Sequence, residues 1–263
     1  MKKLIFVNQK GGSGKSILSY NMAHYLADQG KRVLFIDGDE QANSSKSLAA
    51  FATPGLGALA LFGHSFTALP VRQAGITLLH GDARLRMVEK TLCTDDVLVT
   101  TLRGNLDSIA DHFDYAVIDT AGANSRVANA LLVASDYAVL PCRIDPYSID
   151  VATEVLRRIL SVQQKFNPGL VNLGILPNEV DASSGAQHDW INQLSAAYPQ
   201  FVMAMRVPRR SAYREACAAG VPVWRLRKEN ADGSQGDVKT SARIAGHEVR
   251  QVFKIIQNLM EYS

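Results

Sequence analysis

The segment of this chain with the clearest chemical signal is a run of glycines and lysines near the N-terminus. Positions 9–16 read Gln-Lys-Gly-Gly-Ser-Gly-Lys-Ser and follow the apolar run 4–7. A glycine-rich turn that leads into a helix presents backbone N–H groups to anionic oxygens. In such a loop the last lysine, Lys15, reaches the β- and γ-phosphates of a nucleotide, and the hydroxyl of Ser16 holds Mg²⁺. The segment therefore predicts a phosphate-binding loop.

Acidic side chains follow two further apolar runs. The run 32–36 leads into Asp37 and Asp39, and the run 115–118 ends at Asp119. Two carboxylates two positions apart, just past a strand end, can both face a cleft, and an acid that ends an apolar strand typically holds Mg²⁺ directly or through water. The alternatives are a solvated acidic turn for the first pair and a helix cap for Asp119.

These side chains need a scaffold that brings strand ends together. Short apolar runs alternate with helical patterns, which predicts an α/β fold with a doubly wound, mostly parallel sheet of about seven strands and helices on both faces. We expect one domain over residues 1–263. The expected strands are 4–8, 33–36, 76–80, 115–119, 137–141, 171–176 and 201–205. The expected helices are 15–29, 83–92, 96–111, 126–134, 150–165, 187–198, 211–219 and 241–260.

Composition excludes several other classes. The three cysteines, Cys93, Cys142 and Cys217, are far apart and form no C-x-x-C pair, which argues against a zinc or iron–sulfur site and suits a reducing cytoplasm. The first strand begins too early for a signal peptide, and no apolar run approaches the roughly 20 residues that span a bilayer. The six histidines show no metal-ligand spacing, and His24 is expected at the surface. We therefore expect a cytoplasmic protein.

Positive charge is concentrated in the C-terminal quarter. Between Arg206 and Lys254 there are eleven Lys and Arg against five Asp and Glu, although the whole chain carries only +3. Such an imbalance favours a polyanionic partner, with an ordinary soluble surface as the alternative. The candidate DNA-binding residues are Arg209, Arg210, Arg214, Arg225, Arg227, Arg243 and Arg250.

The lysine that opens the glycine run gives the loop a family resemblance. Gln9 stands where the strict phosphate-loop pattern has glycine, and Lys10-Gly11-Gly12-Ser13-Gly14-Lys15-Ser16 resembles the deviant Walker A motif of the ParA/MinD family of dimerising ATPases. The run 37–41 resembles the family's D-x-D-P-Q, with Glu40 in place of proline. Positions 120–122, Thr-Ala-Gly, resemble small plasmid-type ParA proteins and the accessory ATPases of conjugative DNA transfer.

The resemblance implies a role for each matched residue. Lys10 would cross a dimer interface to the partner's nucleotide, Asp39 would orient or activate the attacking water, and Asp37 would support Mg²⁺. Asn178 matches an adenine-contacting position, with an ordinary turn residue as the alternative. The implied catalytic residues are Lys10, Lys15 and Asp39; the nucleotide-binding residues are Gly11, Gly12, Ser13, Gly14, Lys15, Ser16, Ile17, Asn178 and Pro208; the metal-binding residues are Ser16, Asp37 and Asp119.

Three functions within the family remain open at this point. The first is a segregation ATPase that uses ATP and Mg²⁺, dimerises with ATP, binds nonspecific DNA at the nucleoid and is stimulated by a ParB-like adaptor. The second is an accessory ATPase of conjugative transfer with a relaxosome-type adaptor. The third is a MinD-like membrane-cycling ATPase, which the sequence disfavours because the C-terminal helix lacks a terminal basic cluster. Outside the family stand a metabolic ligase or kinase and a nucleotide-binding module without turnover.

Overall fold

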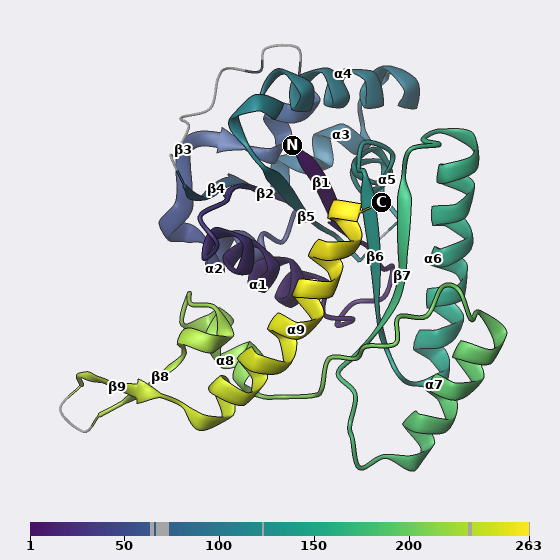
Figure 1. The fold of residues 1–263 in the computed structure, drawn as a ribbon. Coiled ribbons are helices and arrows are strands. Elements are labelled where there is room, and N and C mark those ends of the chain that lie inside the picture. The colour runs from purple at the N-terminus through teal and green to yellow at the C-terminus, as the bar shows by residue number, and fades with distance from the viewer. Residues whose placement is uncertain (64–65, 67–73, 123, 231–232, 263) are drawn as a thin grey trace.

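A parallel sheet forms the centre of the computed structural model, which describes residues 1–63, 66, 74–122, 124–230 and 233–262 (Figure 1). Its seven strands lie in the order β3-β4-β2-β5-β1-β6-β7, and the paired strands run parallel. The strands are β1 (Lys2–Phe6), β2 (Arg32–Gly38), β3 (Ala52–Gly57), β4 (Gly75–His80), β5 (Tyr115–Thr120), β6 (Tyr137–Arg143) and β7 (Val171–Asn178). The expected α/β fold is confirmed.

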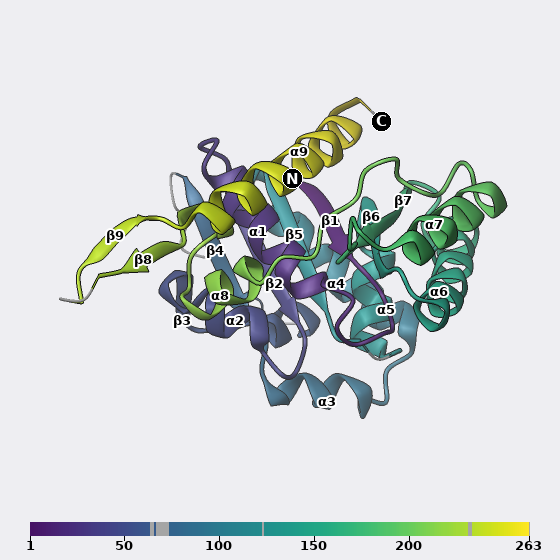
Figure 2. The same ribbon diagram turned by 90° about the horizontal axis from the view of Figure 1, so that it is seen from below.

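Helices cover both faces of this sheet. On one face α4, α5 and α6 bury apolar side chains against the strands, and on the other face α1, α8 and α9 do the same (Figure 2). The helices are α1 (Lys15–Ala27), α2 (Asn43–Ser47), α3 (Arg86–Glu89), α4 (Asp95–Ser108), α5 (Arg126–Val133), α6 (Pro146–Lys165), α7 (Gly185–Ala197), α8 (Ala212–Ala218) and α9 (Thr240–Tyr262). Strands buried on both sides explain the near-continuous Val, Ile and Leu runs in the sequence.

A small hairpin stands apart from the main sheet. Strands β8 (Arg227–Glu229) and β9 (Gln235–Val238) pair antiparallel and project away from the body of the protein in both views (Figures 1 and 2). The sequence patterns did not predict this hairpin, because neither strand is apolar and both are mostly exposed.

One expected strand is replaced by another. Residues 201–205 contribute only a single bridge, from Val202 to Ile175, instead of a strand. Beside that bridge Gly174 has a positive φ of 105°, which bends the edge of β7 away from a regular ladder. The seventh strand is β3, at residues 52–57, where the sequence patterns predicted no strand.

Helix α6 begins four residues earlier than the apolar pattern indicated. Asp145 is its N-cap, and the carboxylate accepts a hydrogen bond of 2.9 Å from the backbone N–H of Ser148. Pro146 occupies the first turn, where its missing N–H costs nothing. The start signal was present in the sequence as Asp-Pro, and the apolar periodicity that we followed begins only later.

The C-terminal helix packs against the sheet, as expected. The apolar side chains of α9 are buried, among them Val249, Phe253 and Ile256 at 0% exposure. The hydroxyl of Tyr137 donates a hydrogen bond of 2.8 Å to the carbonyl of Met260, which fixes the end of the helix to β6. No helix in the described ranges has the length and apolarity that a bilayer crossing requires.

The expectation that His24 lies at the surface is wrong. Its ring is 5% exposed and packs edge-on against Tyr20 and Phe51, with ring centroids at 4.8 and 5.6 Å. Burial, with a smaller contribution from Arg225, lowers the pKa of His24 to about 4. The imidazole is therefore neutral in the folded protein at neutral pH.

This buried histidine predicts a loss of stability in mild acid. An unfolded histidine has a pKa near 6.5, so the unfolded chain binds a proton more readily, and the native state loses stability as pH falls from about 6.5 to about 4. The full loss is on the order of 3 kcal/mol. Chemical unfolding of His24→Leu should show a smaller stability decrease over this range than wild type, while His247→Leu, at an exposed position of α9, should match wild type. Equal decreases in all three proteins would contradict the prediction.

Candidate functional site

The glycine-rich loop between β1 and α1 has the shape that its sequence predicts. Gly12 and Gly14 have positive φ values of 72° and 92°, and α1 begins at Lys15. The side-chain amide of Asn178 donates a hydrogen bond of 2.8 Å to the carbonyl of Ser13, and it lies so close to Gly14 that a Cβ there would be 2.0 Å from its nitrogen. Both the backbone conformation and this contact require glycine at position 14.

Two polar atoms in this loop are buried without a strong partner. Among the described residues, the hydroxyl of Ser13 has no hydrogen-bond partner, and the ammonium of Lys15 has a single hydrogen bond, of 3.4 Å, to the carbonyl of Lys10. Burial lowers the pKa of Lys15, and the carboxylates of Asp119 and Asp39 oppose that shift. Because a desolvated cation and an orphaned hydroxyl are costly, both fit a loop that is completed by an anionic ligand.

The carboxylates that end β2 and β5 lie side by side. Asp37 and Asp119 are partners in the strand register, and both are fully buried. Burial, followed by the neighbouring Asp119, raises the pKa of Asp37 to about 7, and burial also raises that of Asp119. Ser45 donates to Asp37 through its hydroxyl (2.5 Å) and its N–H (2.8 Å), while the Ser44 hydroxyl donates to Asp119 at 2.6 Å.

These groups fit a bound magnesium ion. The hydroxyl of Ser16 lies within hydrogen-bonding reach of Asp119, so a hydroxyl and a carboxylate converge beside the glycine-rich loop. A divalent cation there would relieve the repulsion between Asp119 and Asp37. In the part of the chain that the structure describes, no group of three or more His, Cys, Asp and Glu forms a metal site by itself. Mg²⁺ commonly uses few protein ligands and takes the others from phosphate and water.

Asp39 lies at the mouth of the site and is less buried than Asp37. One of its carboxylate oxygens accepts a hydrogen bond of 2.9 Å from the N–H of Gln41, which leaves the other carboxylate oxygen available. The next residue, Glu40, forms a paired contact with Arg86 at 2.6 and 2.9 Å. This ion pair ties the segment after β2 to α3 at the position where the family motif has proline.

The segment after β5 approaches the glycine-rich loop closely. A Cβ on Gly122 would lie 3.2 Å from the carbonyl oxygen of Gln9 and 3.4 Å from the nitrogen of Gly11. Any larger residue would have to displace one of the two segments. The backbone of Gly122 therefore lies beside the phosphate loop.

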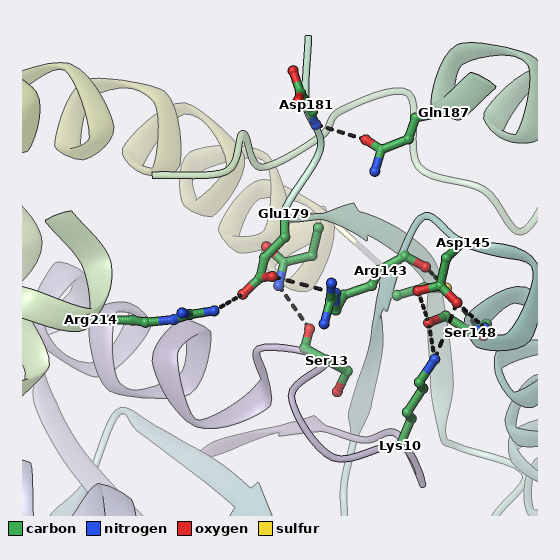
Figure 3. A network of polar contacts seen from close by, with 11 residues as sticks. Lys10, Ser13, Arg143, Asp145, Ser148, Glu179, Asp181, Gln187 and Arg214 are labelled. Carbon is green, nitrogen blue, oxygen red and sulfur yellow. Dashed lines mark hydrogen bonds and ion pairs between the residues drawn. The ribbon is translucent and has the colours of Figure 1, made fainter. Parts of the chain in front are cut away.

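Lys10 is held within its own chain in this structure (Figure 3). Its ammonium contacts the carboxylate of Asp145 at 3.2 Å and the hydroxyl of Ser148 at 2.7 Å, both at the start of α6. The lysine side chain is 33% exposed. Lys10 therefore points away from the pocket that Lys15 enters, in keeping with a role outside its own phosphate loop.

A small cavity adjoins the phosphate loop on the side away from Asp39. It has a volume of about 150 Å³ and is lined by Gly14, Ile17, Asn178 and Pro208, four of the predicted nucleotide-binding residues. Glu179 forms part of the wall in a left-handed conformation with φ of 53°, and its carboxylate lies 3.4 Å from both Arg143 and Arg214 (Figure 3). Strained residues of this kind cluster at ligand sites.

The predicted DNA-binding arginines fall into two groups. Arg210, Arg214 and Arg225 are paired with carboxylates, namely Glu248, Glu179 and Asp28 respectively. Arg250 donates to the carbonyl of Gly246 and stacks over Trp224. By contrast, no carboxylate among the described residues pairs with Arg209, Arg227 or Arg243, and all three are exposed.

Sequence analysis missed the two serines that support the buried acids. Ser44 and Ser45 belong to α2, a helix of five residues that is too short to give an apolar pattern. The only signal was a serine pair shortly after the acidic motif, which is common in ordinary turns. Asn21 on α1 has a packing role, because its side-chain carbonyl accepts a hydrogen bond of 2.9 Å from the N–H of Val223.

A phosphate loop with two strand-end carboxylates is typical of P-loop nucleotide-binding proteins. Comparison with known protein families and sequences identifies the family. The AAA domain family model (AAA_31) matches residues 1–172, and the VirC1 protein model matches residues 99–262. Protein IncC of Escherichia coli is 34% identical over 277 residues, covering 100% of this chain and 71% of IncC. The chain therefore belongs to the ParA/MinD family of AAA-domain ATPases.

Two further similar proteins are a chromosome partitioning protein and an enzyme whose structure contains a bound nucleotide analogue. Chromosome partitioning protein ParA of Caulobacter vibrioides is 27% identical over 255 residues. The matched region is 94% of this chain and 95% of that ParA. A solved structure of cobyrinic acid a,c-diamide synthase from Mycobacterium smegmatis, with bound ATP analogue and magnesium, is 27% identical with a TM-score of 0.70, over 83% of this chain and 93% of that one.

Proposed function

We propose that this chain is an ATP-dependent dimerising ATPase that binds nonspecific DNA in its ATP state and drives plasmid or chromosome segregation. The observation that carries the proposal is the meeting of Lys15, Asp119 and Asp39 at one edge of the sheet, next to a second lysine, Lys10, that stays outside the pocket. Membership of the ParA/MinD family supports the use of this site for ATP.

Each residue of the site would have its own role in ATP hydrolysis. Lys15 and the backbone of the glycine-rich loop would hold the β- and γ-phosphates. Mg²⁺, held by Ser16 and Asp119 with support from Asp37, would neutralise charge on the phosphates. Asp39 has a carboxylate oxygen available at the mouth of the site to orient the attacking water or accept its proton. The cavity formed by Asn178 and Pro208 would take the adenine base.

ATP-dependent dimerisation follows from the position of Lys10. A cation that is supplied by one protomer to the triphosphate of the other stabilises the pair only while the γ-phosphate is present. In the free chain this lysine is shared between Asp145 and Ser148, at a partly exposed contact that a triphosphate can replace. Hydrolysis would then loosen the dimer and release whatever the dimer binds.

Removal of this lysine should separate nucleotide binding from dimerisation. Lys10→Ala keeps Lys15 and the glycine-rich loop, so its ATP affinity should stay within a few-fold of wild type, whereas ATP should no longer drive it into a dimer. Nucleotide titration checks the first point and sedimentation velocity with and without ATP checks the second. Lys165→Ala, at an exposed position of α6, is the matched control. An unaltered ATP-induced dimer in Lys10→Ala would refute the role in trans.

Nonspecific DNA binding is supported by the exposed arginines that have no carboxylate partner among the described residues. Arg209, Arg227 and Arg243 are exposed around α8, α9 and the projecting hairpin, on the side of the sheet where α9 packs. Each phosphate contact weakens with salt, and a dimer presents every contact twice. A dimer should therefore bind duplex DNA far more tightly than a monomer, which makes DNA binding dependent on ATP. A ParB-like or relaxosome-type adaptor would stimulate hydrolysis and end the cycle.

Duplex-DNA binding in three nucleotide states tests this function. Asp39→Ala protein is measured without nucleotide, with ADP and with ATP–Mg²⁺ over a range of salt concentrations, and binding is expected only with ATP. Adding Arg209→Ala and Arg243→Ala should reduce the slope of log affinity against log salt by about 2 to 4 for a dimer. Adding Arg157→Ala, on the opposite face of the sheet, should leave the slope unchanged.

The remaining functions predict different results in the same assay. No DNA binding in any nucleotide state would overturn the proposal and favour a ligase-like enzyme with a second substrate. DNA binding that does not depend on nucleotide would also overturn the switch. A segregation ATPase and a conjugation accessory ATPase both bind DNA with ATP, and the genes that neighbour this one distinguish them.

A further inference from the structure

A large groove lies on the face of the protein opposite α9. Helix α5, with 8 residues, is shorter than α4 and α6, which have 14 and 20 (Figure 1). Side chains of all three helices line the groove. The groove has a volume of about 580 Å³, within the range of ligand-binding pockets. Its apolar lining includes Val99, Val133 and Phe166, and Phe166 is 57% exposed.

Positive charge in this groove is only partly neutralised. Two acids, Asp95 and Asp96, and three arginines line it. Arg126 is paired with Asp95 at 2.8 Å. Arg103 contacts only the backbone carbonyls of Val133 and Phe166, at 2.8 and 3.4 Å. Arg158 is half-buried and donates to the side-chain carbonyl of Asn129. Within the described ranges, neither Arg103 nor Arg158 has a carboxylate partner.

We propose that the groove between α4 and α6 is a docking site for an acidic amphipathic segment of a partner protein, with a carboxylate on Arg158 and apolar side chains against Phe166, Val99 and Val133. Charge complementarity selects this occupant. A guanidinium that is half-buried among apolar side chains gains most from a carboxylate that can accept two hydrogen bonds. An apolar peptide would leave this charge unpaired, and a basic peptide would repel it.

The polar wall of the groove contacts the loop that follows β5. Arg158 contacts Asn129, and the amide of Asn129 donates a hydrogen bond of 3.2 Å to Asn124. Asn124 lines the groove and lies two residues after Gly122, which touches the phosphate loop. A segment bound to Arg158 therefore sits one short chain of contacts away from the loop that follows β5. Docking itself requires neither DNA binding nor ATP hydrolysis, so this inference stands apart from the function proposed above.

Peptide binding with charge-matched probes tests the inference. Three synthetic amphipathic peptides share the same leucine positions and carry glutamate, glutamine or lysine at the neighbouring polar positions. Fluorescence anisotropy with the full chain should show saturable binding of the glutamate peptide, binding of the glutamine peptide about tenfold weaker and no binding of the lysine peptide. Arg158→Gln should weaken the glutamate peptide about tenfold and leave the glutamine peptide nearly unchanged.

Two further variants protect the test against loss of folding. Arg158→Lys keeps the charge but loses the forked geometry and should give intermediate affinity, and Arg157→Gln, the exposed neighbour on the same helix, should match wild type. Equal affinity for all three peptides, no binding of the glutamate peptide, or no effect of Arg158→Gln would each overturn the proposal. A loss of duplex-DNA binding in Arg158→Gln, without an effect on peptides, would assign the groove to nucleic acid and overturn it too.

Discussion

Lys15→Ala should abolish nucleotide binding. Lys15 is the buried cation of the phosphate loop, and in the part of the chain that the structure describes its ammonium makes one long hydrogen bond, with the carbonyl of Lys10. Charge-assisted hydrogen bonds in a buried site contribute the most to anion binding, so loss of a lysine shared by two phosphates should reduce ATP affinity by at least about 100-fold. Isothermal titration with ATP and ADP measures the effect directly.

The same substitution needs a check on folding, because Lys15 also offsets the charge of Asp119. Thermal unfolding of Lys15→Ala should remain cooperative, and Lys15→Arg supplies a variant that keeps the charge while losing the compact ammonium. Lys46→Ala, an exposed lysine in α2, should bind ATP as wild type does. Tight ATP binding by a folded Lys15→Ala protein would refute the assignment of the loop.

Asp39→Ala should bind ATP and accumulate as a dimer without turning ATP over. Asp39 lies at the mouth of the site, and it supports Asp37 only through its backbone N–H, which donates a hydrogen bond of 3.1 Å to the Asp37 carboxylate. Alanine keeps that N–H, so the substitution should leave the loop, Ser16 and Asp119 in place. Loss of the group that positions the attacking water should slow hydrolysis by about 10²- to 10⁴-fold. Single-turnover hydrolysis measures the rate, and sedimentation velocity with ATP measures the dimer.

Two comparisons make this prediction specific. Asp107→Ala, an exposed acid on α4, should hydrolyse ATP at the wild-type rate. Asp39→Asn keeps the size of the side chain and removes its charge, so it should behave as Asp39→Ala does if the carboxylate is what matters. Normal turnover by either Asp39 variant would show that another group positions the water.

Sequence patterns predicted the fold where local signals agreed with the tertiary structure. The apolar runs at β1, β2, β5 and β6 are buried on both faces, so their patterns are strong, and each is followed by a residue type that fits the site. Patterns failed at the edges of the sheet. Residues 201–205 are as apolar as a strand, but their neighbour β7 bends at Gly174, whereas β3 carries proline and glycine and still pairs with β4.

The candidate site shows a similar division. The residues predicted to contact phosphate or Mg²⁺ lie within short motifs, so Lys15, Asp37 and Asp119 could be proposed from the sequence. The residues that hold these groups in place act across long distances in the sequence. Asn178 supports the Ser13 carbonyl from 165 positions away, and Ser44 reaches Asp119 across 75. The ion pairs of the arginines likewise depend on the folded structure. Composition could not predict that Arg210 is paired with a carboxylate and that Arg209, among the described residues, is not.

Residues 207–214 bear on how the proposed ATPase would distinguish ATP from ADP. Pro208 lines the cavity beside Gly14, and the same few residues carry Arg209, Arg210 and Arg214 at the surface. Occupation of that cavity by a base would press on this stretch directly. ATP and ADP carry the same base, so they would act alike there. In the proposed function, any distinction between the two would therefore arise at the opposite end of the site, near Asp39 and Gly122, and would affect the arginines through the proposed dimer.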